Sequence, residues 1–150
     1  MVDPHPTKQS KTARWGLGIL LVVSALFGLN GVGWIFFGPN ASLSNMADNM
    51  GVSVTDLESA YPMAANAIGQ EARRVAVYLA AIGAMGFIAA LAGLGRQARW
   101  SWHITWVLIA TLVALFLIGL AGGLGPFGAT SLGLAVLALI GQLLARTERT

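Results

Sequence analysis

The chain contains no cysteine and few charged residues, which make up only 10% of its 150 positions. Soluble domains usually carry about 25% charged residues. Without cysteine the chain can form no disulfide and offers no thiolate to a metal ion or to a disulfide relay. The low charge excludes an ordinary soluble domain, and the missing thiols exclude the cysteine-based membrane enzymes.

Hydrophobic residues, by contrast, are abundant and make up 56% of the chain. They are gathered into runs over residues 15–38, 75–95, 104–124 and 127–145, and none of these runs contains Asp, Glu, Lys or Arg. A helix needs about 20 apolar residues to cross a bilayer core of roughly 30 Å. The first run is also longer than the apolar part of a signal peptide. We therefore predict an all-α integral membrane protein, a bundle of four transmembrane helices.

The predicted boundaries follow these runs. We expect a disordered tail over 1–13, a membrane domain over 14–145 with an outer segment at 39–62, and a second tail over 146–150. The expected helices cover residues 15–38, 63–95, 101–123 and 127–145.

Basic residues in the flanks of the helices indicate the orientation. Seven of the nine lie on one side of the predicted membrane, and the other side has only Arg73 and Arg74. The positive-inside rule then places both termini in the cytoplasm of a cell that has this protein in its plasma or inner membrane. The net charge of +3 is explained by this topology and requires no nucleic acid. The seven residues are Lys8, Lys11, Arg14, Arg96, Arg99, Arg146 and Arg149.

The outer segment is expected to hold short helices. The sequence "TDLE" is a T-x-x-E capping box that predicts a helix starting near Asp56. Pro62 suits the first turn of the following long helix. Another short helix, lying on the membrane surface, is predicted by apolar residues at i, i+3 and i+7, namely Leu43, Met46 and Met50.

Small residues form rows inside the predicted spans. In lipid, helices associate where small residues allow their backbones to approach closely. These rows predict packing within the bundle, with docking against another subunit or a second copy as the alternative. The residues concerned are Gly28 in the first helix, Ala76, Ala80 and Ala84 in the second, and Gly119 and Gly123 in the third.

The stretch "GQEARRVAVYLAAIG" contains the candidate ligand site. Glu71, Arg74 and Tyr78 share one helix face, whereas Arg73 is expected to face lipid headgroups. One interpretation is an interfacial ion pair whose arginines extend toward the headgroups. The other is an outward-facing pocket under the 39–62 segment, which would hold a quinone or a lipid headgroup.

Other chemistry finds little support. Met46, Met50 and Met63 could offer thioethers to Cu(I), although methionines on an apolar face usually serve packing. No other metal site and no cofactor is predicted. Ion-coupled transporters usually carry an acid or a base at membrane depth, which these runs lack, so a small transporter is the third hypothesis. No catalytic constellation is present, so catalysis by this chain alone is not expected; a membrane enzyme that uses Glu71 and Tyr78 is the remaining alternative.

The order of the elements resembles the small bacterial four-helix membrane proteins that include the DoxX-like families of unknown function. The resemblance is carried by "GWIFFGP", by "ARRVAVYLAAIGAMGFIAAL" and by "GRQARWSWHITW". It implies an accessory role beside respiratory or quinone-linked oxidoreductases. The leading prediction is therefore a non-catalytic accessory subunit of a larger membrane complex, or a self-associating bundle. A quinone- or lipid-binding, redox-linked protein is the alternative.

Overall fold

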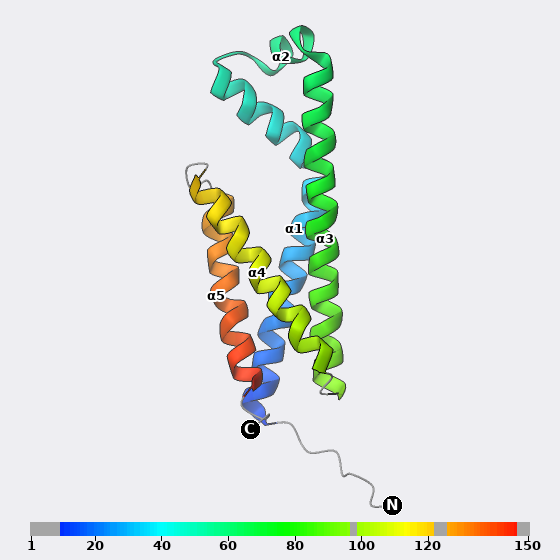
Figure 1. Cartoon of the computed structure of the whole chain (residues 1–150), viewed down its shortest axis with the longest axis vertical. Helices are drawn as coiled ribbons and strands as arrows, with labels where there is room; N and C mark the ends of the chain where they lie inside the picture. The colour runs from blue at the N-terminus through cyan, green and yellow to red at the C-terminus, as the bar shows by residue number, and fades with distance from the viewer. Residues whose placement is uncertain (1–9, 97–98, 122–125, 147–150) are drawn as a thin grey trace, which may run out of the picture. The chain divides into compact units, whose positions relative to one another are not determined.

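The structure is a computed structural model that describes residues 10–96, 99–121 and 126–146. All the regular secondary structure of these residues is helical. Figure 1 shows the helices in chain order, with α4 and α5 packed side by side. Their bounds are α1 Lys11–Met50, α2 Val54–Ala60, α3 Pro62–Arg96, α4 Arg99–Ala121 and α5 Pro126–Arg146.

The helices belong to two compact units. Unit 1 contains the chain up to Ser24 and from Met85 onward, and unit 2 contains Ala25–Ala84. Helices α1 and α3 therefore pass from one unit into the other, while α2 lies wholly within unit 2 and α4 and α5 within unit 1.

Three helices among the described residues are long and apolar enough to cross a membrane. They lie over Lys11–Met50, Pro62–Ala92 and Trp100–Leu120. This agrees with the expectation of a membrane protein built from apolar helices. In α5, the stretch Thr130–Ala145 forms a shorter apolar helix.

Helix α1 is much longer than predicted, because it begins at Lys11 and continues to Met50 instead of covering residues 15–38. The prediction ended the helix before Pro39, which has no backbone N–H and leaves the carbonyl of Ile35 without its usual donor. A proline inside a helix can bend it instead of ending it. In Figure 1 the cyan C-terminal part of α1 runs at an angle to the part before it.

The chain reverses direction after α1 through a short turn. Gly51 has a φ of 67°, in the left-handed region where a glycine lacks the Cβ that would clash. Ser53 then caps α2: its hydroxyl accepts a hydrogen bond from the N–H of Asp56 at 3.0 Å and donates one to the Asp56 carboxylate at 2.6 Å. A short helix does occur where the capping box predicted one. Its N-cap, however, is Ser53 rather than Thr55.

The outer segment has its own small core. Leu43 and Ala47 of α1, Leu57 of α2 and Ala65 of α3 are buried together. Leu43 and Ala47 take the buried positions while Met46 and Met50 are exposed, and the expectation that this apolar face lies on the membrane surface stays a prediction. Burial against two other helices favours a helical course for α1 beyond the proline, since packing stabilises a helix more than intrinsic propensity does. The segment is thus a packed helical element.

In unit 2, α1 and α3 approach closely at small residues. A Cβ added to Gly31 would lie 2.8 Å from the Cα of Ala80 and 2.9 Å from the carbonyl carbon of Leu79. A Cβ on Gly28 would be in ordinary contact, 3.6 Å from the Cα of Gly83. Only a glycine fits at position 31, whereas position 28 has room for a Cβ.

Unit 1 contains a second close approach and a buried polar cluster. A Cβ on Gly16 would lie 2.6 Å from the backbone nitrogen of Ala145, so α1 and α5 touch there through their backbones. Between α4 and α5, the Thr105 hydroxyl is 2.7 Å from the Gln142 side-chain oxygen, and the Gln142 amide donates to the Trp102 carbonyl at 3.3 Å. A buried amide in a membrane bundle commonly bridges helices in this way.

A candidate ligand groove in the outer segment

Unit 2 contains a groove of about 340 Å³, within the size range of small-molecule sites. It is lined by residues of α1 and α3, with Glu58 contributed by α2. Positions 62, 65, 66, 69 and 73 of α3 share one helix face, because their spacing follows the helical repeat. The lining residues are Pro39, Asn40, Leu43, Glu58, Pro62, Ala65, Asn66, Gly69 and Arg73.

The floor of the groove is apolar and its rim is polar. Pro39, Leu43, Ala65 and Gly69 are buried and form the floor. The two helices are in ordinary contact here, since a Cβ on Gly69 would lie 3.6 Å from the Cβ of Pro39. The charged and amide side chains that line the groove all belong to exposed residues. This division of an apolar base and a polar edge suits an amphipathic ligand.

Three polar groups at the rim are free to bind a ligand. Among the residues that the structure describes, Glu58, Arg73 and Asn40 make no side-chain hydrogen bond or ion pair. The carbonyl oxygen of the fourth polar residue, Asn66, accepts a 3.4 Å hydrogen bond from the Gln70 amide. The groove therefore offers a carboxylate and a guanidinium, which lie at its two ends, and an amide between them.

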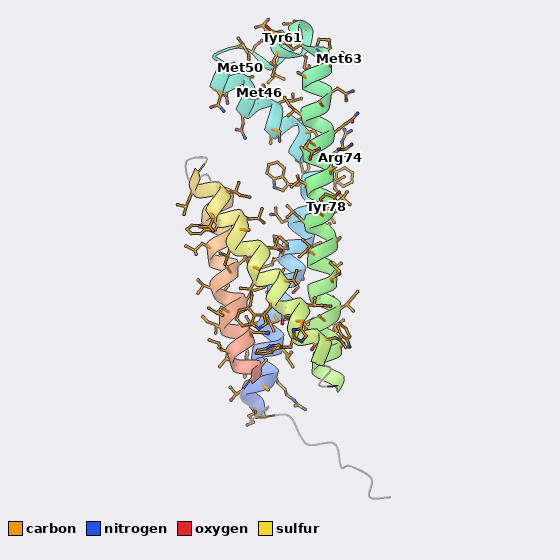
Figure 2. The ribbon with its side chains drawn as sticks, in the orientation of Figure 1. Met46, Met50, Tyr61, Met63, Arg74 and Tyr78 are labelled. Atoms are coloured by element: carbon orange, nitrogen blue, oxygen red, sulfur yellow. The ribbon has the colours of Figure 1, made fainter. Side chains whose placement is uncertain are left out.

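The residues proposed from the sequence lie elsewhere on α3. Arg74 donates to the Glu71 carboxylate at 3.3 Å, and both side chains are largely exposed, at 67% and 65%. Tyr78 is 65% exposed and follows Arg74 along the helix (Figure 2). None of the three lines this groove, in which Arg73 takes the place expected for Arg74. A ligand-binding role for Glu71, Arg74 and Tyr78 stays a prediction.

The methionines that suggested Cu(I) do not converge. Figure 2 shows Met46 and Met50 on the C-terminal part of α1, and Met63 apart from them at the start of α3. Met63 is 88% exposed. Within the described ranges, no group of three His, Asp or Glu residues is placed to hold a metal ion. The exposed thioethers instead give the tip of unit 2 an apolar character.

The predicted small-residue rows are only partly buried. Ala76 is buried and Ala80 packs against Gly31, whereas Ala84 is exposed. Gly119 is half-buried, and Gly123 lies outside the described residues, as do positions 1–9 and 147–150 of the two predicted tails.

Sequence reasoning missed the four polar residues of the groove, namely Asn40, Glu58, Asn66 and Arg73. A signal was present on α3, because Asn66 and Arg73 lie seven residues apart, two turns along one face. No local pattern relates that face to α1 and α2.

Comparison of the chain with protein-family models, with curated proteins and with solved structures found no match. The assignment of a function therefore rests on the geometry of the chain itself.

Proposed function

We propose that this chain is a non-catalytic accessory subunit of a larger membrane complex, with four spans and both termini in the cytoplasm. The three long apolar helices support three of the spans. The apolar stretch of α5 supports the fourth, and the distribution of basic residues supports the orientation. The resemblance to DoxX-like proteins favours a bacterial inner membrane and a respiratory or quinone-linked oxidoreductase as the complex.

The observation that carries the proposal is the length of α1 and α3. At 1.5 Å per residue, the 40 residues of α1 and the 35 residues of α3 measure about 60 Å and 52 Å. A bilayer core is roughly 30 Å thick, so each helix has a surplus of about 20 Å or more. The surplus belongs to the outer segment, where the helices are held by the buried cluster around Leu57. A packed projection outside the lipid has no purpose in spanning the membrane and is suited to contact a partner.

The surface of this projection indicates the chemistry of the partner. Over residues 39–70 the only charges are Asp48, Asp56 and Glu58, all acidic and exposed. Large apolar side chains are exposed beside them, including Tyr61 and Met63 (Figure 2). Methionine and tyrosine are enriched at protein interfaces. The expected partner is a membrane subunit whose outer surface is basic around an apolar centre.

Self-association and transport are less well supported. Ala80 of α3 already contacts Gly31 of α1, and Gly28 of α1 already contacts Gly83 of α3. These two residues are therefore not available to dock a second copy. The described residues inside the apolar runs include no charged side chain, and the buried Gln142 is bonded to α4. Neither the uncharged apolar runs nor the bonded Gln142 provides a path for an ion.

Copurification from native membranes tests the accessory role. A tagged full-length chain, extracted in mild detergent, is expected to retain another membrane subunit in fixed stoichiometry. Combining Asp48→Lys with Met63→Ser should reduce that retention at least about fivefold, since it reverses one charge and removes one apolar contact at the tip. The matched control, Asp48→Glu with Met63→Leu, keeps charge and size. A chain that purifies alone, or a charge-reversed variant that retains the same subunit, contradicts the proposal.

The orientation has its own test, which the absence of cysteine simplifies. Single cysteines at Val52, in the exposed turn after α1, and at Ser10, before α1, give two reporters. A membrane-impermeant maleimide applied to intact cells is expected to label Val52→Cys and not Ser10→Cys. Labelling of Ser10→Cys alone would reverse the proposed topology.

A further inference from the structure

We propose that the groove of unit 2 binds an aminophospholipid headgroup, with the phosphate at Arg73 and the primary ammonium at Glu58. This site shares Glu58 with the acidic surface that carries the accessory role, but neither Asp48 nor Met63, which the copurification test changes, lines the groove. The shared chemistry is a phosphate joined to a primary amine, which a membrane lipid or free phosphoethanolamine can supply.

The position of Arg73 indicates the phosphate. Arg73 and Arg74 are the last charged residues before the uncharged run 75–95. If that run crosses the bilayer, Arg73 lies at the level of the lipid phosphates. A guanidinium matches a phosphate with two parallel hydrogen bonds. Arg74 is paired with Glu71 on an exposed part of the same helix, whereas Arg73 lines the groove without a protein partner among the described residues.

The opposite end of the groove indicates the amine. Glu58 of α2 lines the groove together with Pro62 of α3, and Pro62 lies eleven residues before Arg73 along α3. This places the two ends roughly 16 Å apart at the level of the backbone. Both charged side chains are long and can reach toward each other across this distance, so the ligand must carry its positive charge only a few atoms away from its phosphate. An ammonium can donate hydrogen bonds to the Glu58 carboxylate, whereas a quaternary amine cannot.

The middle of the groove suits the part of the ligand between these charges. Leu43, Pro39 and Ala65 give it an apolar floor. The Asn40 amide has both donor and acceptor capacity and no hydrogen-bond partner among the described residues. In this headgroup only two methylene groups join the phosphate to the ammonium; they suit the apolar floor, and the phosphate oxygens can accept a hydrogen bond from the Asn40 amide.

Lipid retention by the full-length chain tests the assignment. The delipidated protein in detergent is mixed with equal amounts of dioleoyl phosphatidylethanolamine, phosphatidylglycerol and phosphatidylcholine, and bound lipid is counted by native mass spectrometry. Phosphatidylethanolamine is expected to be retained roughly fivefold to tenfold over each of the others, the size of one exposed charge-assisted hydrogen bond. Equal retention of the three lipids overturns the proposal.

Three charge variants assign the two ends. Arg73→Gln is expected to weaken retention of phosphatidylethanolamine and phosphatidylglycerol alike, by roughly fivefold to tenfold. Glu58→Gln should remove only the preference for the amine. Arg74→Gln is the matched control, with the same change one residue away and outside the groove, and should leave retention unchanged. An effect of Arg74→Gln equal to that of Arg73→Gln contradicts the site.

A pair of variants at Gly69 tests the groove without changing charge. Gly69→Leu fills the floor and is expected to abolish the preference for phosphatidylethanolamine. Gly69→Ala adds a Cβ that would meet Pro39 at an ordinary 3.6 Å, so it should retain the preference. Thermal unfolding of each variant shows that the chain is folded. Retention by Gly69→Leu at the level of Gly69→Ala overturns the proposal even where the charge variants misfold.

Free phosphoethanolamine distinguishes the two sources. If millimolar phosphoethanolamine displaces the bound lipid, the zwitterion alone is the recognised unit and a soluble ligand is the source. If the lipid remains, its acyl chains contribute and the membrane is the source. If neither compound binds, the inference fails, and the accessory role stays open to its own copurification test.

Discussion

The close approach of α1 and α3 in unit 2 gives a sharp prediction for Gly31→Ala. The added Cβ would lie 2.8 Å from the Cα of Ala80, well inside the 3.5–4.0 Å at which carbon atoms attract each other. The neighbouring atoms belong to the backbone, so no side chain can rotate away and the helices must separate. Gly33→Ala is the matched control, because nothing lies within 4 Å of its Cβ and the gain in helix propensity is the same.

The difference between these two variants isolates the cost of overpacking, which is about 1–3 kcal/mol. With a shift of about 2–4 °C per kcal/mol for a chain of this size, Gly31→Ala should melt roughly 2–12 °C below Gly33→Ala. Thermal unfolding of the two purified proteins in one detergent, followed by intrinsic tryptophan fluorescence, measures this. If the two melt within about 1 °C of each other, the backbones do not meet at Gly31 and the reasoning fails.

Three further predictions concern unit 1. Gly16→Ala should destabilise the protein by about 1–3 kcal/mol relative to Gly18→Ala. The Cβ at position 16 would lie 2.6 Å from the α5 backbone, whereas nothing lies within 4 Å of a Cβ at position 18. SDS-induced unfolding compares the two variants, and equal midpoints would contradict the prediction. Ser24→Ala should not destabilise, since its hydroxyl is buried without a hydrogen-bond partner among the described residues. It should also lessen the cost of Gly86→Ala, whose Cβ would lie 2.8 Å from that hydroxyl; a double-mutant cycle with no coupling would refute this. Gln142→Leu should cost about 1 kcal/mol, because it removes a 2.7 Å hydrogen bond to α4, and an unchanged unfolding midpoint would count against that bond.

The helical class and the long apolar helices could be predicted from the sequence because lipid leaves the backbone few choices. In a bilayer every N–H and C=O must be bonded within the chain, so a long apolar run becomes a helix. The runs 75–95 and 104–124 accordingly lie largely within α3 and α4. The length of the apolar runs and their lack of charge are enough for this inference.

The course of α1 could not be predicted in the same way. A proline followed by polar residues normally indicates the end of a helix. Here Leu43 and Ala47 are buried against other helices, and that burial favours a helical course on the far side of Pro39. The contact joins residues that are distant in sequence, and no pattern within 39–50 reveals it.

The choice between Arg73 and Arg74 depended on the same missing information. Helical spacing showed that Arg74 shares a face with Glu71, and these side chains do form an ion pair. Spacing does not show which face is turned toward α1 and α2. The structure turns the face of Gly69 and Arg73 toward the groove, so the residue first assigned to headgroups became the candidate ligand contact.

The spacing of small residues identified the α3 side of the contact between α1 and α3, but not the α1 side. Ala76 and Ala80 were recognised by their spacing of four, but their close neighbour Gly31 belongs to no such row. A crossing needs one small residue on each helix at one level, which is a property of two helices together. A row on a single helix predicts that a contact exists and leaves its partner open.

The exposed turn at Gly51 is a suitable place to divide the chain into two fragments. The unit boundaries, after Ser24 and after Ala84, both fall inside unbroken helices, so no loop separates the units. A cut in the turn would instead leave two fragments that each carry part of both units. The fragments would still meet at Gly31 in unit 2 and at Gly16 in unit 1. The chain is therefore suited to reconstitution from two coexpressed halves divided after Gly51, and poorly suited to isolation of either unit.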